Sequence, residues 1–273
     1  MDTVKTALVG CGKIGRTHAL ALRDAPQSNF VAVCDADSER AKAFAAEFGV
    51  AAFATVDEMI GKTGAKAVAV STPHPLHAPI VLAAIAAGAH ALVEKPLAAS
   101  LADCDRMIAA CSRTDTLLQV NHNRRWSPEW NLGLELLRDG AIGELNHIYC
   151  YMDGGKPTPS WRSENEGPLL HDFTHYFDLM DLYGGAVEWL CGMAEQRRRP
   201  WAVEDFSAAF MKFKSGVTGV IHGAELTEYT DNSFELRGTR GIIRFVQEQV
   251  QLLQSEQDVY EPDSGFQWSS LQS

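Results

Sequence analysis

A glycine-rich segment near the start of the chain has the spacing of a phosphate-binding loop. Gly10, Gly12 and Gly15 form a G-x-G-x-x-G pattern that follows an apolar, strand-like run and opens a predicted helix. Bare backbone N–H groups at a helix N-terminus can hold the pyrophosphate of a dinucleotide, and glycine lets the phosphates approach the backbone closely. The pattern also occurs in turns that bind nothing, so a second residue of the same chemistry is needed to support it.

Asp35 is that second residue. It ends the apolar run VAVCD and lies 20 residues after Gly15, where a carboxylate can accept hydrogen bonds from the adenosine ribose hydroxyls. The same carboxylate repels a 2′-phosphate, so the sequence predicts NAD rather than NADP as the cofactor. Ser38 and Arg40 lie nearby and could accommodate a 2′-phosphate, which leaves NADP as the alternative.

Lys95 is a candidate for direct contact with a substrate. The segment Glu94-Lys95-Pro96 follows a predicted strand, and ligands of open α/β sheets bind in the crevice outside the carboxyl ends of the strands. A lysine there can polarise a carbonyl or stabilise an alkoxide as a hydrogen-bond donor. The alternative interpretation is a surface lysine before a proline that merely ends a strand.

The elements that would position these residues follow two patterns. Over the first 120 residues, short apolar runs alternate with helical patterns, which predicts βαβ units and a parallel sheet. The predicted strands are Ala7 to Val9, Val31 to Cys34, Ala67 to Val70, Ala91 to Val93 and Leu117 to Val120. The predicted helices are 38–48 with a Ser38 cap, 76–87, and 100–112 with a capping box of Ser100 and Asp103.

The pattern changes after residue 121. Helices are predicted at 128–138 and 169–182, on either side of a loop at 153–167 that is rich in Pro, Gly, Ser and Asn. Alternating polar and apolar runs with turn signals at 214–216 and 238–241 then predict an antiparallel sheet. The predicted fold is α/β: a doubly wound parallel sheet over 1–121, followed by an α+β domain over 122–273 whose sheet needs a partner on at least one face.

Composition excludes several classes of function. The 273 residues are 46% hydrophobic and 22% charged, with a mean hydropathy of −0.13, which is the profile of a globular protein. The net charge is −11, so we expect neither nucleic acid nor an anionic membrane as a partner, because phosphate binding needs a basic stripe. The one basic run, 197–199, is interpreted as a solvated edge.

The six cysteines and the N-terminus suggest a compartment. No C-x-x-C pair occurs, and a core of this size needs no disulfides, so we expect reduced thiols. The chain shows no signal-peptide pattern and no run of 18 uncharged apolar residues. These features predict a cytoplasmic protein.

Several longer strings resemble one enzyme family. The segments GCGKIGRTH, VCDADSERA and STPHPLHAPIVLAAIAAGAHALVEKPLAAS are similar to the N-terminal pattern of the Gfo/Idh/MocA family of NAD(P)-dependent oxidoreductases. The positions that match this pattern are His18, Asp35, Thr72, Pro73, His77, Gly88, Glu94, Lys95 and Pro96. NRRWSP at 123–128, GAIGEL at 140–145, Trp161-Arg162 and GTRG at 238–241 resemble the family's second half.

The resemblance implies a Rossmann domain followed by an open-faced sheet used for substrate binding and oligomerisation. It implies hydride exchange between a nicotinamide and a carbinol carbon of a sugar, cyclitol or related polyol. The cofactor contacts it implies are Gly10, Gly12, Lys13, Ile14, Gly15, Asp35, Ser71, Thr72, Pro73, His77, Glu94 and Lys95. The substrate contacts it implies are Lys95, Arg125, Trp161, Arg162, His171, Asp172 and His175.

The chain departs from the family at the catalytic helix. Family members place an Asp and a His four residues apart, whereas here His171 stands at the Asp position and His175 keeps the position of the proton-transfer residue. Asp172 is displaced by about 100° around a regular helix. Imidazole suits proton transfer near neutral pH. The resemblance thus predicts Lys95, His175 and His171 as the catalytic residues.

Two alternatives remain beside this hypothesis. His171 and His175 have the spacing of two metal ligands on one helix face, but no Glu follows His171 and no third ligand can be placed, so we expect no metal. The missing Asp also allows a catalytically silent nicotinamide-binding sensor or partner-binding protein. Because the second domain is expected to expose an apolar sheet face, we predict a homodimer or homotetramer.

Overall fold

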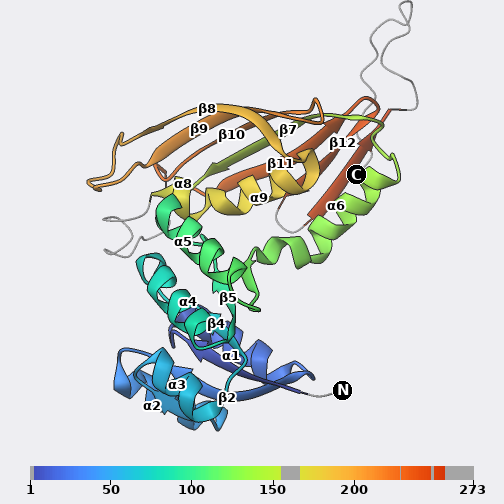
Figure 1. Ribbon diagram of the computed structural model, residues 1–273. Helices are drawn as coiled ribbons and strands as arrows, with labels where there is room; N and C mark the ends of the chain where they lie inside the picture. The colour runs from blue at the N-terminus through green and yellow to red at the C-terminus, as the bar shows by residue number, and fades with distance from the viewer. Residues whose placement is uncertain (1–2, 155–166, 228, 247–248, 256–273) are drawn as a thin grey trace, which may run out of the picture. The chain divides into compact units, whose positions relative to one another are not determined.

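The computed structural model describes residues 3–154, 167–227, 229–246 and 249–255. The chain forms two compact units, Met1–Asn121 and His122–Ser273, and each is described by itself. Figure 1 shows the order of their elements along the chain. In the described part of the chain, no helix is both long enough and apolar enough to cross a bilayer.

The first unit is a parallel sheet with helices on both faces. Its strands are β1 (Val4–Val9), β2 (Ser28–Cys34), β3 (Ala51–Phe53), β4 (Ala67–Val70), β5 (His90–Glu94) and β6 (Leu118–Asn121). Its helices are α1 (Lys13–Asp24), α2 (Ser38–Phe48), α3 (Val56–Thr63), the 3₁₀ turn η1 (His74–Leu76), α4 (His77–Ala86) and α5 (Leu101–Ser112). The strand order is β3-β2-β1-β4-β5-β6, so the chain reverses direction across the sheet between β1 and β4. In such sheets this switch point, at the carboxyl ends of the strands, is where ligands bind.

Both faces of this sheet are buried by small and branched side chains. Ala19 of α1 and Ala45 of α2 pack with Leu8 and Val33 on one face. The helices α3, α4 and α5 cover the other face, with Met59, Val81 and Met107 fully buried. Burial on both faces is the reason why the strands are continuously apolar rather than alternating.

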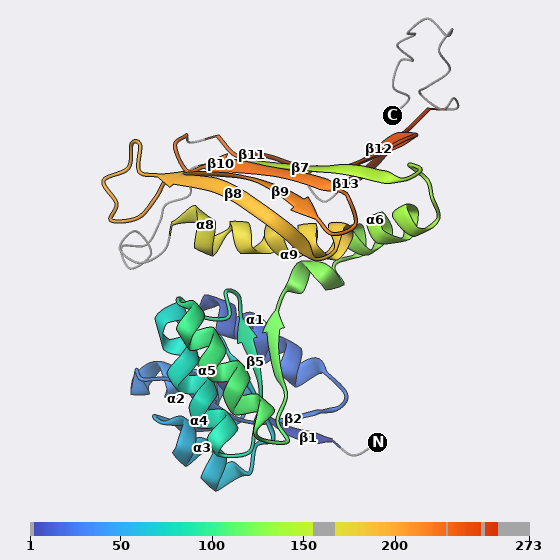
Figure 2. The same ribbon diagram turned by 45° about the horizontal axis from the view of Figure 1, so that its top comes forward.

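The second unit is a mixed sheet covered by helices on one face. Its strands are β7 (Leu145–Asp153), β8 (Val187–Glu195), β9 (Phe206–Phe213), β10 (Thr218–Ala224), β11 (Asp231–Gly238), β12 (Gly241–Val246) and β13 (Gln249–Gln254). Its helices are η2 (Asn123–Trp126), α6 (Pro128–Arg138), α8 (Pro168–His171) and α9 (Phe173–Gly184). The order is β13-β12-β11-β7-β10-β9-β8, with β7 and β10 parallel and the other pairs antiparallel. Figure 2 shows α6, α8 and α9 on the same side of this sheet.

The core of the second unit lies between these helices and the sheet. Alternate residues of β9 and β11 face it, so Met211, Phe213, Phe234 and Leu236 are buried. Their neighbours, such as Phe210, lie on the other face, where Phe210 is 39% exposed. The prediction of a parallel doubly wound sheet followed by a mainly antiparallel sheet with one uncovered face is confirmed.

Two local predictions are wrong, and one short strand was missed. The cap of α2 is Asp37, not Ser38, because the Asp37 carboxylate accepts the N–H groups of Glu39 and Arg40. β3 was not predicted because it is only three residues long and begins with two alanines, which carry little strand signal. The helix predicted at 169–182 is interrupted at Asp172 and forms α8 and α9 instead.

Candidate active site

The glycine loop joins β1 to α1, and its three glycines have different structural reasons. Gly10 adopts a φ of +99°, which a side chain would strain. A Cβ atom at Gly15 would collide with the carbonyl oxygen of Gly10, because the helix and the loop pack directly on each other. A Cβ atom at Gly12 would meet nothing within 4 Å. Gly12 is therefore the glycine that borders open space.

The N-terminus of α1 is open to a ligand. Gly12 is the N-cap residue, so no side chain accepts a hydrogen bond from the first turn of the helix. Lys13 and Ile14 follow it and are exposed. Uncapped N–H groups of this kind attract phosphate oxygens.

Asp35 is held next to the glycine loop by four hydrogen bonds. It directly follows β2, and its carboxylate accepts from the backbone N–H groups of Cys11 at 2.8 Å and Asp37 at 2.9 Å. The Arg40 guanidinium donates to both of its oxygens, through Nε at 3.1 Å and Nη2 at 2.8 Å. Burial raises the pKa of Asp35, but these bonds outweigh it and the pKa lies below its usual value. Asp35 is therefore ionised at neutral pH.

These residues fit a dinucleotide. The uncapped helix N-terminus provides donors for the pyrophosphate, and the ionised Asp35 provides an acceptor for ribose hydroxyls. The methyl group of Thr72 lies against Gly10, and the Thr72 hydroxyl is buried without a hydrogen-bond partner among the described residues. Such a group indicates a donor or acceptor that is supplied from outside the chain.

The segment after β4 supports the loop from the other side of the switch point. The Ser71 hydroxyl donates to the carbonyl oxygen of Gly10 at 2.9 Å. Pro73 leads into η1, and His77 begins α4 with its ring fully buried. Its Nδ1 lies 3.0 Å from the carbonyl oxygen of Pro96 and its Nε2 lies 2.9 Å from that of Thr72. The ring of His77 thus joins the loops that follow β4 and β5.

Lys95 and Glu94 lie at the carboxyl end of β5. Lys95 is only 8% exposed. The Glu94 carboxylate contacts Nε2 of His18 at 2.8 Å and accepts from the Asn121 amide at 2.7 Å. Burial raises the pKa of Glu94, but the bonds from His18 and Asn121 outweigh burial and lower it. Glu94 is thus a partly buried anion that binds the backbone N–H from which Lys95 extends.

In the second unit, His171 and His175 lie on either side of the helix interruption. The Thr174 hydroxyl donates to the carbonyl oxygen of His171 at 3.3 Å, and the His175 N–H binds the carbonyl oxygen of Asp172 at 3.2 Å. The i to i+4 bond between the two histidines that a regular helix would have is thereby replaced. Asp172 keeps helical backbone angles at the interruption, with φ −99° and ψ −38°, so the angular offset of about 100° expected for it stays a prediction. Nε2 of His171 lies 3.6 Å from the Asp172 carboxylate.

The start of α8 is fixed by a residue distant in sequence. The Leu169 N–H donates to Oε1 of Glu204 at 2.9 Å, and the Glu204 carboxylate also packs against Gly167, where a Cβ atom would collide with it. Glu204 belongs to the loop between β8 and β9. No local pattern predicts this contact, because it joins residues 35 positions apart.

The two arginines of η2 have different partners. Arg125 binds the Asp178 carboxylate through Nε at 2.9 and 2.8 Å and reaches Asp181 at 3.4 Å. Arg124 lies over the ring of Tyr176 at 4.2 Å, and it lines a cavity of about 370 Å³ beside α6. Arg125, the predicted substrate contact, thus joins η2 to α9, and Arg124 lines the cavity instead. Arg124 is not predicted as a site residue, because two adjacent arginines carry no signal that distinguishes them.

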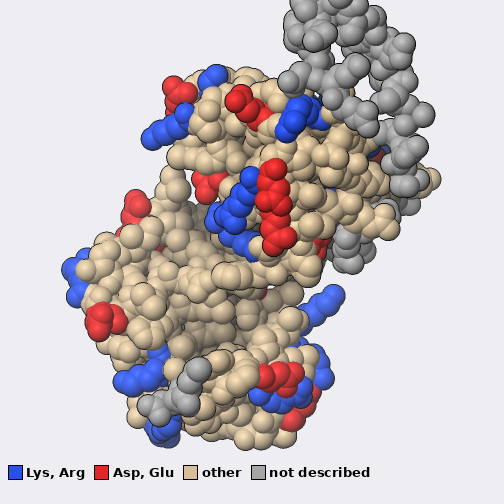
Figure 3. All heavy atoms as spheres, turned by 90° about the vertical axis from the view of Figure 1, so that its right-hand side faces the viewer, with Lys and Arg blue, Asp and Glu red and all other residues tan. Residues whose placement is uncertain are grey.

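Two predicted substrate contacts, Trp161 and Arg162, lie outside the described residues. Among the residues that the structure describes, no group of three His, Cys, Asp or Glu side chains could hold a metal ion. Figure 3 shows Lys and Arg side chains interspersed with Asp and Glu on the face drawn, without a broad basic area.

Comparison with known proteins identifies both units. The family described as "Oxidoreductase family, NAD-binding Rossmann fold" matches residues 4–122, and the "GFO/IDH/MocA C-terminal domain" matches residues 134–244. The chain is 32% identical to a D-apiose dehydrogenase of Paraburkholderia graminis over 253 residues, which cover 88% of this chain and 67% of that protein. It is 28% identical to the myo-inositol 2-dehydrogenase of Thermotoga maritima, covering 88% and 74% of the two chains.

A solved structure has the same arrangement of elements. The WlbA dehydrogenase from Bordetella pertussis, in complex with NADH and UDP-GlcNAcA, matches with a TM-score of 0.86 at 25% identity. The match covers 96% of this chain and 79% of that one. The glycine loop and Asp35 described above lie within the matched NAD-binding domain, so the cofactor prediction of NAD is confirmed.

Proposed function

The chain belongs to the Gfo/Idh/MocA family of oxidoreductases, and on that premise we propose that it catalyses the reversible oxidation of a secondary alcohol on a sugar, cyclitol or related polyol. It is an NAD-dependent dehydrogenase or reductase that acts on CH–OH groups. The names of its relatives, D-apiose dehydrogenase and myo-inositol 2-dehydrogenase, support the substrate class that we propose.

One observation carries the proposal most directly: a buried lysine lies at the edge of the sheet that binds the cofactor. Lys95 follows β5 and Gly10 follows β1 in one parallel sheet, so both lie at its carboxyl edge. Lys95 is 8% exposed, and its backbone is held by Glu94 and by the loop that His77 contacts. A buried lysine whose backbone is fixed in this way is suited to stabilise negative charge on a substrate oxygen through its ammonium group.

We assign the chemical roles as follows. NAD, when bound, supplies the acceptor for the hydrogen that leaves the carbinol carbon with its electron pair. In the direction from alcohol to ketone, a ring nitrogen of His175 accepts the hydroxyl proton. Lys95 donates a hydrogen bond to the same oxygen as its negative charge develops. His171 orients the substrate, and in the reverse direction His175 returns the proton.

The proposal is tested by a screen for NADH formation. The purified chain is incubated with NAD and a panel of sugars, sugar phosphates, nucleotide sugars and inositols, with the corresponding ketones and NADH in parallel. For a compound that turns over, Lys95→Ala and His175→Ala should each lower kcat by roughly 10²-fold, the usual contribution of a positioned acid–base or electrostatic group. The Kd for NAD should stay within about threefold, because neither residue is assigned to pyrophosphate or ribose binding. Tight NAD binding without turnover on any compound would instead favour the catalytically silent binding protein.

We also propose that the uncovered face of the second sheet joins copies of this chain into a dimer or tetramer. Trp189 and Phe210 lie next to each other on that face, with ring centroids 5.4 Å apart, and are 44% and 39% exposed. Met193 on the same edge strand is 47% exposed. Monomeric proteins rarely leave such large apolar groups together in water.

Light scattering tests the assembly. The unmodified chain should have the mass of a dimer or tetramer at micromolar concentration, and Phe210→Glu should shift it to the monomer. Leu101→Glu is the matched control, because Leu101 is 84% exposed at the start of α5 in the other unit. A monomeric unmodified chain, or equal effects of the two variants, would contradict the assignment of this face.

A further inference from the structure

Three consecutive arginines occupy the loop between β8 and β9, and one carboxylate fixes their backbone. Asp205 is fully buried and accepts the backbone N–H groups of Arg197 at 2.7 Å, Arg198 at 2.8 Å and Arg199 at 2.6 Å. The sequence predicts a solvated edge for this run. That prediction accounts for exposed arginine side chains, but it does not account for three backbone N–H groups bound to one buried carboxylate. The fold holds these three residues in one conformation.

The three side chains have different partners. Arg197 pairs with Glu195 at 2.8 Å and lies over the ring of Phe206 at 3.4 Å. Arg198 donates to the carbonyl oxygen of Leu226 at 3.4 Å, and Arg199 donates through Nε to that of Glu225 at 2.8 Å. Carbonyl oxygens orient a guanidinium group but do not neutralise its charge. In the described part of the chain, neither Arg198 nor Arg199 forms an ion pair with a carboxylate.

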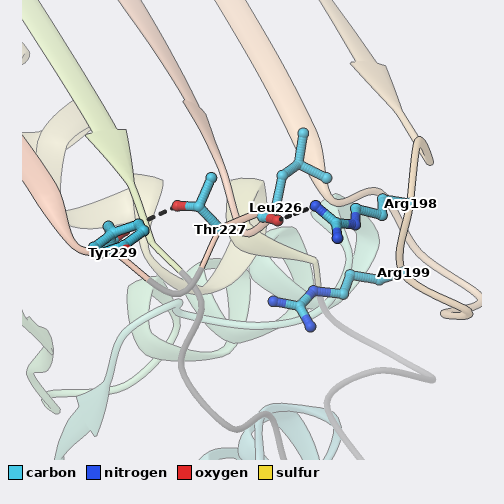
Figure 4. Close-up of a pocket in the computed structure, with 5 residues that line it drawn as sticks. All are labelled: Arg198, Arg199, Leu226, Thr227 and Tyr229. Carbon is cyan, nitrogen blue, oxygen red and sulfur yellow. Dashed lines mark hydrogen bonds between the residues drawn. The ribbon is translucent and has the colours of Figure 1, made fainter.

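Both guanidinium groups line a cavity of about 310 Å³. The other lining residues are Leu226, Thr227 and Tyr229, from the segment that follows β10. Figure 4 shows the two arginine side chains extending side by side from their loop toward this segment. A volume of this size is at the lower end for small-molecule sites, and it accommodates an anionic group together with part of the molecule that carries it.

Two like charges held side by side repel each other, and the repulsion is relieved when an anion binds both. Guanidinium groups match the planar geometry of carboxylate and phosphoryl oxygens and bind them through paired hydrogen bonds. We propose that Arg198 and Arg199 form a binding site for a carboxylate or phosphoryl group of the substrate. The substrate class is then an acidic or phosphorylated sugar derivative rather than a neutral polyol, an inference that rests on the proposed function.

The position of the loop supports its role in substrate binding. Glu204 lies in the same loop and binds the backbone of Leu169, so the arginine loop is fixed to α8, the helix that ends at His171. β8 ends at Glu195 and β10 ends at Ala224, so the arginines and the segment lining the cavity leave the same edge of the sheet. A substrate held by its anionic group at this loop is therefore positioned relative to α8 within one unit.

The test compares neutral and anionic forms of the same sugar. Binding of D-glucose, D-glucuronate, D-glucose 6-phosphate and inorganic phosphate to the full chain with NAD is measured by calorimetry, which does not depend on turnover. The anionic sugars should bind at least tenfold more tightly than D-glucose. Arg198→Gln and Arg199→Gln should each weaken their binding about tenfold, the effect expected when a hydrogen bond to a charged group is lost, and the binding of D-glucose should not change.

Arg197→Gln is the matched control, because it removes the same charge from the same loop but its side chain is paired with Glu195 outside the cavity. It should change the binding of the anionic sugars less than twofold. Equal effects of all three variants, or equal binding of neutral and anionic sugars, would overturn the proposal. If inorganic phosphate binds as tightly as the phosphorylated sugar, the site takes a free anion and the assignment to substrate is wrong.

Turnover separates this proposal from the proposed function. If the anionic sugars bind as expected but no member of the wider screen forms NADH, the oxidoreductase reaction fails while the anion site stands. If a neutral polyol turns over and Arg198→Gln leaves its KM and kcat unchanged, the reaction stands while the substrate class inferred here fails. For an anionic substrate that turns over, KM should rise about tenfold in Arg198→Gln with kcat unchanged.

Discussion

The two units of the chain position their chemistry-bearing residues by different means. In the first unit, Gly10, Asp35 and Lys95 each directly follow a parallel strand, so the topology of the sheet brings them to one edge. In the second unit, His171 and His175 flank a broken helix whose start is bound by Glu204, a residue from a loop 35 positions away in sequence. The residues of the NAD-binding unit are therefore positioned by local sequence and sheet order, and those of the second unit are positioned by a long-range contact.

The two units differ in how far a sequence motif predicts the geometry of a site. A pattern such as G-x-G-x-x-G predicts a site because each glycine has a local reason to be there, and those reasons can be tested one residue at a time. A pair of histidines four residues apart predicts geometry only if the helix between them is regular, which here it is not.

The largest expected effect is on the glycine loop. Gly15→Ala should lower the free energy of unfolding by about 3 kcal/mol, because the added Cβ collides with the rigid backbone of Gly10. Urea unfolding of the chain without NAD measures this loss.

Gly12→Ala is the matched comparison, since its Cβ meets nothing within 4 Å. It should leave the free energy of unfolding within about 0.5 kcal/mol, while the Kd for NAD rises about tenfold because the methyl group occupies the approach to the helix N-terminus. Equal destabilisation of the chain without NAD by Gly12→Ala and Gly15→Ala would contradict these roles, in which Gly15 is needed for packing and Gly12 for the approach of the ligand.

The second prediction concerns the broken helix. If His171 has taken the role of the family's Asp, His171→Ala should lower kcat by roughly 10²-fold, and Asp172→Asn should lower it less than threefold. Steady-state kinetics with the substrate found by the screen measures both. If Asp172→Asn lowers kcat more than His171→Ala does, the Asp172 carboxylate, and not the His171 ring, takes the role of the family's Asp.

The structure also shows what kind of information the sequence lacked. The strands and most helix ends of the first unit could be predicted from apolar runs, glycines and caps, because Gly49 and Ser100 act on residues within one turn. At the helix break the Thr174 hydroxyl donates to the carbonyl oxygen of His171, and the His175 N–H donates to that of Asp172. Neither contact has a periodic signal in the sequence. The anchoring of three arginines by Asp205 likewise depends on a hairpin loop whose conformation a charge run does not predict.

The third prediction tests how the Asp205 carboxylate fixes the backbone of the arginine loop. Burial raises the pKa of Asp205, but the three backbone N–H groups outweigh it and hold the pKa below its usual value. The ionised Asp205 carboxylate therefore contributes its full stabilisation above the pKa of about 3.9 that Asp has in an unfolded chain. This stabilisation is lost as the pH falls through the lower pKa of Asp205 in the folded chain. Asp205→Asn should lower the free energy of unfolding by about 2 kcal/mol at pH 7. The difference between variant and unmodified chain should shrink below about pH 4.

Glu195→Gln is the control for this effect, because Glu195 is the last residue of β8 and an exposed partner of Arg197. Loss of the Glu195–Arg197 ion pair should lower the free energy of unfolding by less than about 0.5 kcal/mol, because exposed ion pairs contribute little. Urea unfolding at pH 7 and at pH 3.5 measures both variants, and a loss in Asp205→Asn that does not depend on pH would contradict the role of the ionised carboxylate.

The fourth prediction concerns Arg40 in the NAD-binding unit, where we expect the smallest change. Arg40 donates to both oxygens of Asp35, yet Cys11 and Asp37 also bind that carboxylate through their backbone N–H groups. Arg40→Ala should therefore leave Asp35 in place and ionised, and the Kd for NAD should change less than about threefold. The Kd for NADP should rise about tenfold, because the cation that could face a 2′-phosphate is gone.

Asp35→Ala is the reciprocal variant. It should weaken the binding of NAD more than that of NADP, because the ribose acceptor and the charge that repels the 2′-phosphate are lost together. Fluorescence titration of both cofactors against both variants measures the four ratios. Equal loss of NAD and NADP in Asp35→Ala would show that the carboxylate holds the glycine loop through Cys11 rather than the ribose.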